Sequence, residues 1–255
     1  MLQLIIFYIL TLEDYFKTLK QIIEGDDAIT FLSGAGLSTA AGLPDFRSDA
    51  KGFWTKNKPV HFADYLTSAE SRKKSWQNNI AIHHELTSAK PTKMHALIEK
   101  ALKRNHLNSH ITQNIDGLHT SEECLPDQII EIHGTTRKAA CLNCYEEYDV
   151  KDFYEEYSKA DNFPLCPKCQ NGYVKVATIS FGQQLDSAKL SLAKEKSSQC
   201  RYFIVMGSSL KVSPANHFPR IALNNNAKLI ILNYDSTPFD SAAEFVINEK
   251  LENIY

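Results

Sequence analysis

The stretch from Ala28 to Arg47 reads AITFLSGAGLSTAAGLPDFR, and the interpretation of the whole chain starts from it. Residues 28–32 form an apolar run with β-branched members after an acidic turn, which is typical of a short buried strand. Gly34-Ala35-Gly36 allows a tight turn, and Ser38 begins residues suited to a helix start. Unpaired N–H groups and the helix dipole at such a junction favour the pyrophosphate of a dinucleotide. The alternative is a strand-to-helix turn without a ligand.

The second half of the stretch favours a ligand. The third glycine comes later than G-x-G-x-x-G requires, so that fingerprint is only approximated. The continuation Gly42-Leu43-Pro44-Asp45-Phe46-Arg47, however, sets an acid, an aromatic ring and an arginine side by side after a proline-fixed turn. A purely structural turn does not need these three side chains. Trp54, in a glycine-bearing loop just beyond, is interpreted either as part of a lid over the nucleotide or as a loop anchor.

The composition is that of a globular protein with a full core. Of 255 residues, 43% are hydrophobic and 23% are charged, which allows one large domain or a large domain with a small one. The net charge of −2 provides no global basic field, so neither nucleic acid nor a membrane is an expected partner. Residues 2–10 are almost wholly apolar but lack a basic region and a cleavage site, which argues against a signal peptide. We therefore expect a cytoplasmic protein.

Four of the six cysteines form two C-x-x-C pairs, and these predict a metal site. Cys141 and Cys144 are separated by residues 145–165 from Cys166 and Cys169, a spacing that suits a zinc ribbon with four thiolate ligands. Four thiolates leave no open coordination position, so the ion is expected to be structural. A redox pair or disulfides are weaker alternatives, because no βαβ pattern flanks the pairs.

The remaining chain alternates between strand and helix patterns, which predicts an α/β fold with a doubly wound parallel (Rossmann-like) sheet. Helices are expected over 12–23, 72–86 and 91–105, and strands over 109–112, 129–132, 173–181, 202–206 and 228–232. The nucleotide-binding domain is predicted to comprise 12–48, 92–136 and 177–255. The inserted smaller zinc-ribbon/helical domain is predicted to comprise the four-cysteine module, 137–176, and a helical segment, 49–91.

Polar residues follow several predicted strands, at the edge where open α/β sheets bind ligands. These are Gln113-Asn114-Ile115-Asp116-Gly117-Leu118-His119, His133-Gly134, Gly207-Ser208-Ser209 and Asn233-Tyr234-Asp235. Taken singly, the first can be an Asx turn and the histidine can be structural.

Together, GAGLSTAAGLPDFR, QNIDGLH, the His-Gly and the cysteine pairs resemble the sirtuins, the NAD-dependent protein-lysine deacylases. The motifs stand in the family's order and span Ala28 to about Leu251. The resemblance implies that the carbonyl oxygen of an acyl-lysine attacks C1′ of the nicotinamide ribose and expels nicotinamide. A histidine base then acts on the ribose hydroxyls, which leads to free lysine and acyl-ADP-ribose.

The resemblance also implies roles for individual residues. Catalysis falls to His133, Asn114 and Asp116, with His133 as the general base. The residues implied to bind NAD are Gly34, Ala35, Gly36, Ser38, Asp45, Phe46, Arg47, Trp54, Gln113, Asn114, Ile115, Asp116, Gly207, Ser208, Ser209, Asn233, Tyr234, Asp235 and Leu251. The acyl-lysine peptide is implied to pair with Phe181, Gly182 and Val212. One structural zinc and NAD as co-substrate are the expected cofactors, and acyl-lysine proteins or peptides the expected partners.

The chain also departs from the family pattern. Lys175-Val176 replaces the common Arg-Pro, Gln183 replaces an acid, and residues 207–209 replace Gly-Thr-Ser. No Tyr-x-x-Arg follows Trp54, which favours acetyl or longer neutral acyl groups over acidic ones. Two other functions remain as alternatives: mono-ADP-ribosyl transfer on the same fold, and a non-enzymatic zinc-ribbon binding module.

Overall fold

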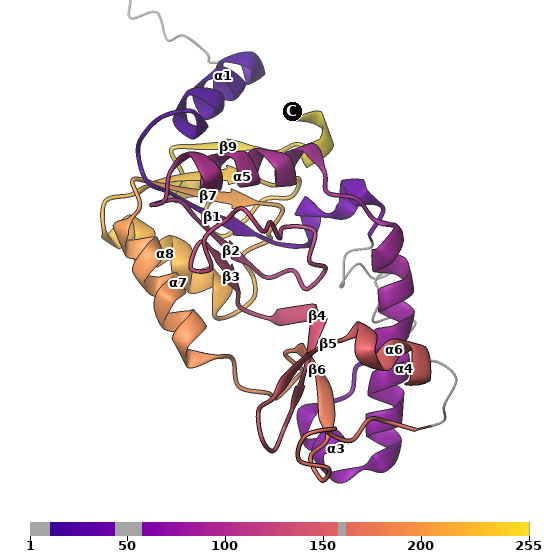
Figure 1. Ribbon diagram of the computed structural model, residues 1–255. Helices are drawn as coiled ribbons and strands as arrows, with labels where there is room; N and C mark the ends of the chain where they lie inside the picture. The colour runs from indigo at the N-terminus through magenta and orange to yellow at the C-terminus, as the bar shows by residue number, and fades with distance from the viewer. Residues whose placement is uncertain (1–10, 44–57, 158–161, 255) are drawn as a thin grey trace, which may run out of the picture.

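The computed structural model describes residues 11–43, 58–157 and 162–254, and two sheets organise them (Figure 1). The larger sheet has six parallel strands in the order β3-β2-β1-β7-β8-β9, and the smaller has three antiparallel strands in the order β5-β4-β6. The strands of the larger sheet are β1 (Ile29–Ser33), β2 (Ser109–Thr112), β3 (Ile129–Glu131), β7 (Tyr202–Met206), β8 (Lys228–Leu232) and β9 (Phe245–Ile247). Those of the smaller sheet are β4 (Gly134–Cys141), β5 (Glu147–Asp149) and β6 (Val174–Thr178).

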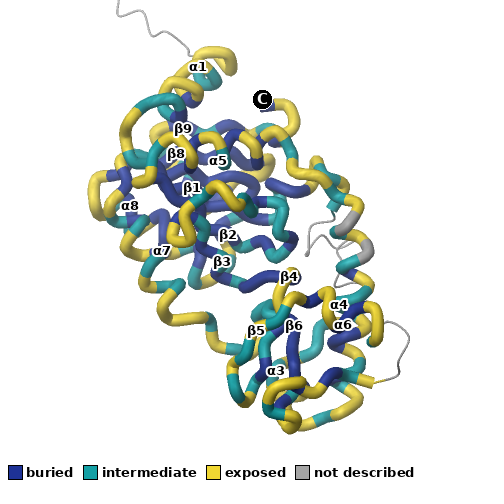
Figure 2. The backbone as a smooth tube through the Cα atoms, viewed as in Figure 1, coloured by how far each residue is buried: buried dark blue, intermediate teal, exposed yellow. Residues whose placement is uncertain are grey.

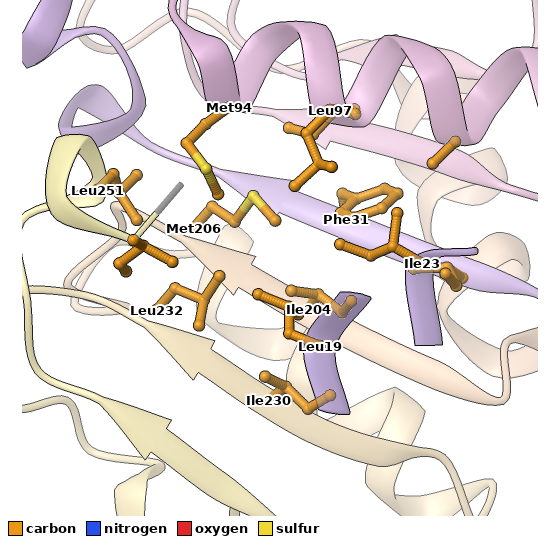
Figure 3. Packing of buried hydrophobic residues seen from close by; sticks show 14 of the residues in the cluster. Leu19, Ile23, Phe31, Met94, Leu97, Ile204, Met206, Ile230, Leu232 and Leu251 are labelled. Atoms are coloured by element: carbon orange, nitrogen blue, oxygen red, sulfur yellow. The ribbon is translucent and has the colours of Figure 1, made fainter. Parts of the chain in front are cut away.

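Helices cover both faces of the larger sheet, as its fully buried strands require. Alternate side chains of each strand enter different apolar clusters: Phe31 faces one, and Leu32 faces the other. The first cluster packs against α1 (Leu12–Ile23) and α5 (Lys93–Arg104), and Figure 3 shows Leu19, Met94 and Leu97 meeting side chains of the strands there. The second cluster packs against α7 (Ser187–Gln199) and α8 (Phe218–Asn224). This arrangement confirms the doubly wound sheet.

The starts of two helices show why the chain turns where it does. Thr11 caps α1 in a capping box with Asp14, as the sequence predicts. Thr92 caps α5, and here His95 completes the box, because its Nδ1 accepts a hydrogen bond from Thr92 N at 3.1 Å. His95 lies off the apolar stripe of this helix in the sequence, which predicts a surface or partly buried side chain, but it is only 4% exposed, so this prediction is wrong. The capping role draws this side chain inward.

The strand predictions hold for β2, β7 and β8 at their exact bounds, whereas β9 was not predicted. β9 has only three residues and exists because Phe245 to Ile247 pair with β8 at the edge of the sheet. Extended structure over 173–181 is shorter than expected, since β6 ends at Thr178 and a turn follows. Short 3₁₀ turns complete the description: η1 (Ala35–Leu37), η2 (Thr39–Ala41), η3 (Ala215–His217), η4 (Asp240–Ala242) and η5 (Leu251–Asn253).

The smaller sheet and the helical segment before α5 form one packed unit (Figures 1 and 2). Its helices are α3 (Phe62–Thr67), α4 (Ala69–Ser88) and α6 (Lys151–Tyr157). Tyr65 of α3 and Trp76 of α4 are each 1% exposed, and both donate hydrogen bonds to the carbonyl oxygen of Val174 in β6, at 2.7 and 2.9 Å. Trp76 is therefore a core residue that joins the helical segment to the cysteine module. Among the described helices, none has the length and apolar character needed to cross a membrane.

The aromatic residues between the cysteine pairs do not all belong to this core. Phe153 and Tyr154 are buried against Trp76, as expected. The position of Tyr145 between the two cysteine pairs predicts that it also belongs to this core, but it is 81% exposed and has a left-handed φ of 60°, so this prediction is wrong. The turn that follows each C-x-x-C pair imposes this conformation and directs the ring to solvent.

Candidate functional site

The glycine turn after β1 lies at the switch point of the sheet. The chain leaves β1 to build β2 and β3 on one side, and it later returns to place β7, β8 and β9 on the other. Ligands of open α/β sheets bind in the crevice outside the carboxyl ends of the strands at this point. Here Gly34 and Gly36 after β1 face Gly207 after β7, because Gly34 N donates to Met206 O at 3.1 Å and Gly36 N donates to Gly207 O at 3.0 Å.

The two turns touch through backbone atoms, and this contact requires glycine. A Cβ on Gly36 would lie 2.7 Å from the Cα of Gly207, and one on Gly34 would lie 2.7 Å from the carbonyl oxygen of Gly207. Gly207 itself has φ +62°, and a Cβ there would approach Leu37 N to 2.4 Å. The result is a surface lined by backbone atoms that a charged group such as a pyrophosphate can approach closely, and this fits a dinucleotide.

One prediction about this turn is wrong in its detail. The expected helix start after Gly36 consists of two 3₁₀ turns, η1 and η2, which end at Gly42 with φ +83°. The N–H groups of Leu37 and Ser38 donate within these turns, to Gly34 O and Ala35 O. These residues therefore do not form the N-terminus of an α-helix with unpaired N–H groups, because the N–H groups are used in hydrogen bonds inside the 3₁₀ turns.

The loop after β2 is held rigidly beside the glycine turn. Asn114 is 2% exposed, and its Nδ2 donates to Gly34 O at 3.1 Å and to Ser38 Oγ at 3.2 Å. Ser38 Oγ in turn donates to Asp116 Oδ2 at 2.7 Å. Gln113 bridges to the other turn, because its Nε2 donates to Ser208 Oγ at 2.8 Å. Six predicted site residues from three separate stretches of sequence are thereby joined: Gly34, Ser38, Gln113, Asn114, Asp116 and Ser208.

The charge of Asp116 is set by this environment. The residue is 9% exposed, and burial by itself raises the pKa of the carboxyl group. The positive charge of His119, together with hydrogen bonds from Ser38 Oγ and Leu118 N, outweighs burial and lowers the pKa below its usual value. Asp116 is thus an ionised acceptor at the floor of the site.

His133 is half-buried at the end of β3 and is oriented from the backbone. Its Nδ1 lies 2.9 Å from Gln113 O, and because a carbonyl oxygen only accepts, Nδ1 carries the proton in the neutral ring. The backbone of His133 is also fixed, since Ile179 N donates to His133 O at 2.9 Å. The lone pair of the imidazole is therefore on Nε2, the nitrogen available as a base.

The predicted substrate residues lie in the turn after β6 and in the loop after β7. Phe181 is 51% exposed, its carbonyl oxygen accepts from Phe62 N at 2.9 Å, and its ring centroid lies 6.0 Å from that of His61. Gly182 has φ +79° and no atom within 4 Å of where its Cβ would stand. Val212 is half-buried, and its carbonyl oxygen accepts from Asn216 N.

The residues predicted at the far end of the cofactor differ in exposure. Asn233 is 8% exposed, and its Nδ2 donates to Asp235 O at 2.7 Å, which leaves Oδ1 as its acceptor. Tyr234 is 64% exposed. Leu251 is 7% exposed and packs with Met206 and Leu232 in the core (Figure 3). Asp45, Phe46, Arg47 and Trp54 lie outside the described residues.

The four predicted cysteine ligands come together in the smaller sheet. Their Sγ atoms all lie within 4.8 Å of one another, with 3.7 Å between Cys141 and Cys169 and 3.6 Å between Cys144 and Cys166. Each pair forms the same knuckle: the residue after the second cysteine has a left-handed φ, and its N–H donates to the carbonyl of the first. The four cysteines are placed to bind one zinc ion, because four clustered thiolates are the donor set of a closed tetrahedral site. Cys124 and Cys200 stand outside the cluster.

The sequence did not predict the polar residues that hold the predicted site residues in place through hydrogen bonds and ion pairs. Thr112 Oγ1 accepts from Asn114 N at 3.0 Å and from Ser33 Oγ at 2.8 Å. His119 and Glu131 form an ion pair beside Asp116. A signal for the last two was present, since His119 ends the polar heptad and Glu131 stands two positions before His133 in a strand that is otherwise apolar.

The parallel sheet has a glycine turn at its switch point, a histidine beside that turn and an inserted module with four clustered thiolates. These features define a nucleotide-binding α/β enzyme with a structural zinc site. Residues 34–214 match the sequence model of the Sir2 family. An NAD-dependent protein deacetylase of Bradyrhizobium diazoefficiens is 36% identical over 235 residues, which cover 92% of this chain and 91% of the relative. The chain belongs to the Sir2 family.

Solved structures agree with this assignment. A Sir2 enzyme bound to a propionylated peptide superposes with a TM-score of 0.76 at 28% identity, covering 93% of both chains. A complex of Sir2 with a p53 peptide and NAD+ superposes with a TM-score of 0.75 at 29% identity, again covering 93% of both chains.

Proposed function

We propose that this chain is an NAD-dependent protein-lysine deacylase that releases nicotinamide, acyl-ADP-ribose and free lysine. The observation that carries the proposal is the position of His133: a histidine with a fixed tautomer stands beside the Asn114–Asp116 loop, which is itself bonded to the glycine turn at the switch point. A base is thus joined to a dinucleotide cradle through a single hydrogen-bonded network. Membership of a family whose curated relatives are deacetylases supports the same activity.

When bound, NAD supplies an electrophilic ribose carbon, C1′, with nicotinamide as its leaving group. We place the pyrophosphate over Gly34, Ala35, Gly36 and Gly207. Ser208 and Ser209 line the adjacent turn, with Ser208 Oγ oriented by Gln113. In this arrangement Asn114 holds the nicotinamide ribose, and Asp116, ionised and fixed by Ser38, accepts from the N–H₂ of the carboxamide.

His133 acts as the general base. With Nδ1 donating to Gln113 O, Nε2 takes a proton from a ribose hydroxyl, so that the oxygen can attack the acyl carbon carried by the substrate. Histidine suits this step because its unperturbed pKa of about 6.5 leaves a neutral fraction near pH 7. The imidazolium that results can return the proton when water completes the release of lysine.

The acyl-lysine peptide is proposed to lie as an extended strand between Phe181-Gly182 and Val212. The exposed ring of Phe181 and the open space at Gly182 leave room for a peptide backbone on this side of His133. Relatives in this family have been solved with a propionylated peptide and with a p53 peptide.

The remaining predicted contacts stay proposals on this mechanism. Phe46 is proposed to shield the departing nicotinamide, Asp45 and Arg47 to order the loop and the phosphate side, and Trp54 and Ile115 to contact the cofactor. At the other end, Asn233, Tyr234, Asp235 and Leu251 are proposed to bind the adenosine. The division into a domain of 12–48, 92–136 and 177–255 and an insertion of 49–91 and 137–176 is part of the same proposal. None of the six cysteines forms a disulfide, and four of them are clustered as metal ligands, which suits the proposed reducing cytoplasm.

The deciding experiment is incubation with NAD and an acetyl-lysine peptide, with both products identified by mass spectrometry. Free lysine peptide and acetyl-ADP-ribose are expected in equal amounts. His133→Ala should lose at least ~100-fold in turnover while it still binds NAD, whereas His106→Ala, at an exposed histidine before β2, should not change. The alternative is ADP-ribosyl transfer. It would be established if labelled ADP-ribose appeared on a protein acceptor faster than the peptide is consumed, and if His133→Ala did not affect this labelling.

A further inference from the structure

Asp116 is the first member of a buried row of charged side chains. Its Oδ1 lies 3.6 Å from Nδ1 of His119, and Nε2 of His119 lies 3.0 Å from Oε1 of Glu131. The three side chains are 4%, 1% and 14% exposed. An imidazole is thus enclosed between two carboxylates that come from different elements, the loop after β2 and the strand β3.

This geometry determines the protonation of His119. A carboxylate oxygen only accepts hydrogen bonds, so a neutral ring would turn one of its lone pairs towards an anionic oxygen. The imidazolium presents an N–H to each side instead. Burial by itself lowers the pKa of His119, but Asp116 and Glu131 outweigh it and raise the pKa above its usual value.

Two further histidines approach the row without adding charge. The ring of His110 in β2 stands edge-on to that of His119, with 5.8 Å between centroids. Burial lowers the pKa of His110 well below its usual value and that of His95 in α5 to about 4, so both are neutral near pH 7. His119 therefore carries the only positive charge among these three rings.

The two carboxylates differ in their other partners. Glu131 has a second cation, because Nη2 of Arg137 in β4 lies 3.8 Å from Oε1, and Nζ of Lys189 in α7 donates to its backbone carbonyl at 3.4 Å. For Asp116, His119 is the only cation that forms an ion pair among the residues the structure describes. The ionisation of Asp116 consequently depends on His119.

We propose that His119 is a positioning residue of the nicotinamide site, which holds Asp116 ionised and in one orientation so that it can accept from the carboxamide. The inference rests on the proposed function, in which Asp116 contacts that group. Ser38 Oγ donates to Oδ2 at 2.7 Å and Leu118 N donates to Oδ1 at 2.9 Å, and the positive charge of His119, whose Nδ1 lies 3.6 Å from Oδ1, stabilises the carboxylate held in this orientation. Without the imidazolium, burial favours the protonated carboxyl group, which has lost its negative charge and has one oxygen turned into a donor, so it is a weaker acceptor for the N–H₂ of a carboxamide.

The test compares His119→Gln with His106→Gln, an identical change at an exposed site. Glutamine keeps one N–H donor but removes the charge. His119→Gln should raise the KM for NAD and the inhibition constant for nicotinamide together, by about tenfold or more, because both ligands carry the carboxamide. The KM for the acetyl-lysine peptide, the zinc content and all values for His106→Gln should remain within twofold of wild type.

The pH dependence separates positioning from a general structural role. In the wild type, calorimetric affinity for nicotinamide should fall as the pH rises through the pKa of His119, which Asp116 and Glu131 raise above its usual value. In His119→Gln the slope should reverse, with affinity falling as the pH drops, because the unpaired Asp116 then becomes protonated. An unchanged profile in a folded His119→Gln protein overturns the proposal.

A double-mutant cycle provides the second arm. If His119 acts through Asp116, adding His119→Gln to Asp116→Asn should change nicotinamide affinity by less than about twofold. Two independent tenfold losses overturn the proposal.

If His119→Gln fails to fold, Glu131→Gln replaces it. Because this change removes one carboxylate beside His119, the fall in nicotinamide affinity at alkaline pH should move to lower pH. A fall that stays at the same pH refutes the inference. If the wild-type protein binds NAD but releases no lysine, only the proposed deacylase function is refuted. If it binds neither NAD nor nicotinamide, the proposed function and the inference about His119 are both refuted.

Discussion

Gly134, directly after the proposed base, offers the sharpest test of how the fold positions the chemistry. It has φ +74°, and a Cβ there would stand 1.9 Å from the carbonyl oxygen of Ala177 in β6. Gly134 pairs with Thr178 across the sheet, and Ile179 N donates to His133 O. Gly134→Ala must therefore push β4 away from the same segment that holds the backbone of His133.

The magnitude follows from these contacts. A left-handed φ costs an alanine about 1–2 kcal/mol, and overpacking against a rigid backbone costs about 1–3 kcal/mol more. We expect a loss of about 2–5 kcal/mol in the free energy of unfolding. Relief of the clash needs a shift of about 1.5 Å, the difference between 1.9 Å and an ordinary contact of 3.4 Å. A shift of about 1 Å at a catalytic group can lower turnover by about 100-fold.

Gly182→Ala is the matched control for stability. Gly182 has φ +79° but no atom within 4 Å of the Cβ position, so only the conformational cost of about 1–2 kcal/mol applies. Thermal and denaturant unfolding give the stabilities, and single-turnover deacetylation gives the rate for Gly134→Ala. Equal losses of stability in the two variants, together with normal turnover in Gly134→Ala, would refute the argument that backbone crowding at Gly134 positions His133.

Three further outcomes are expected. Cys141→Ala should lose the zinc ion and several kcal/mol of local stability, while Cys200→Ala, which lies outside the cluster, should keep the ion. Metal analysis and thermal unfolding measure both effects. A Cys141→Ala protein that is stable and active without zinc would contradict the metal site. Burial lowers the pKa of Lys175 to about 8, so the unfolded chain binds more protons than the folded one between about pH 8 and 10.5, and stability should rise with pH in that window by up to about 3 kcal/mol. Denaturant unfolding of Lys175→Met should lack this rise, and identical pH profiles for the two proteins would show that Lys175 does not cause it. The enzyme should bind NAD more tightly than NADP, because the carboxylate of Asp235 repels a 2′-phosphate. Asp235→Asn should reduce the difference in affinity between the two cofactors. Equal affinities of the wild type for NAD and NADP in calorimetry would contradict this contact.

The sequence by itself determined the features that depend on neighbouring residues. Apolar runs of strand length predicted β7 and β8 at their observed bounds, the short segment before the polar heptad predicted β2, and Thr11 with Asp14 predicted the start of α1. The two C-x-x-C pairs predicted their own cluster, because a knuckle is closed by hydrogen bonds within five residues. The motif order from Gly34 to the cysteine pairs was sufficient to indicate the family.

Only the tertiary structure decided what depends on distant segments. β9 forms because β8 offers an edge, and the turn after Gly36 closes as 3₁₀ turns against Gly207, which lies far away in the sequence. No pattern in the sequence states that His119 stands between Asp116 and Glu131, or that Trp76 is buried against Val174. A charged or polar side chain is stable inside a protein only when specific partners meet it there, and those partners are brought together by the order of strands in the sheet rather than by their spacing along the chain.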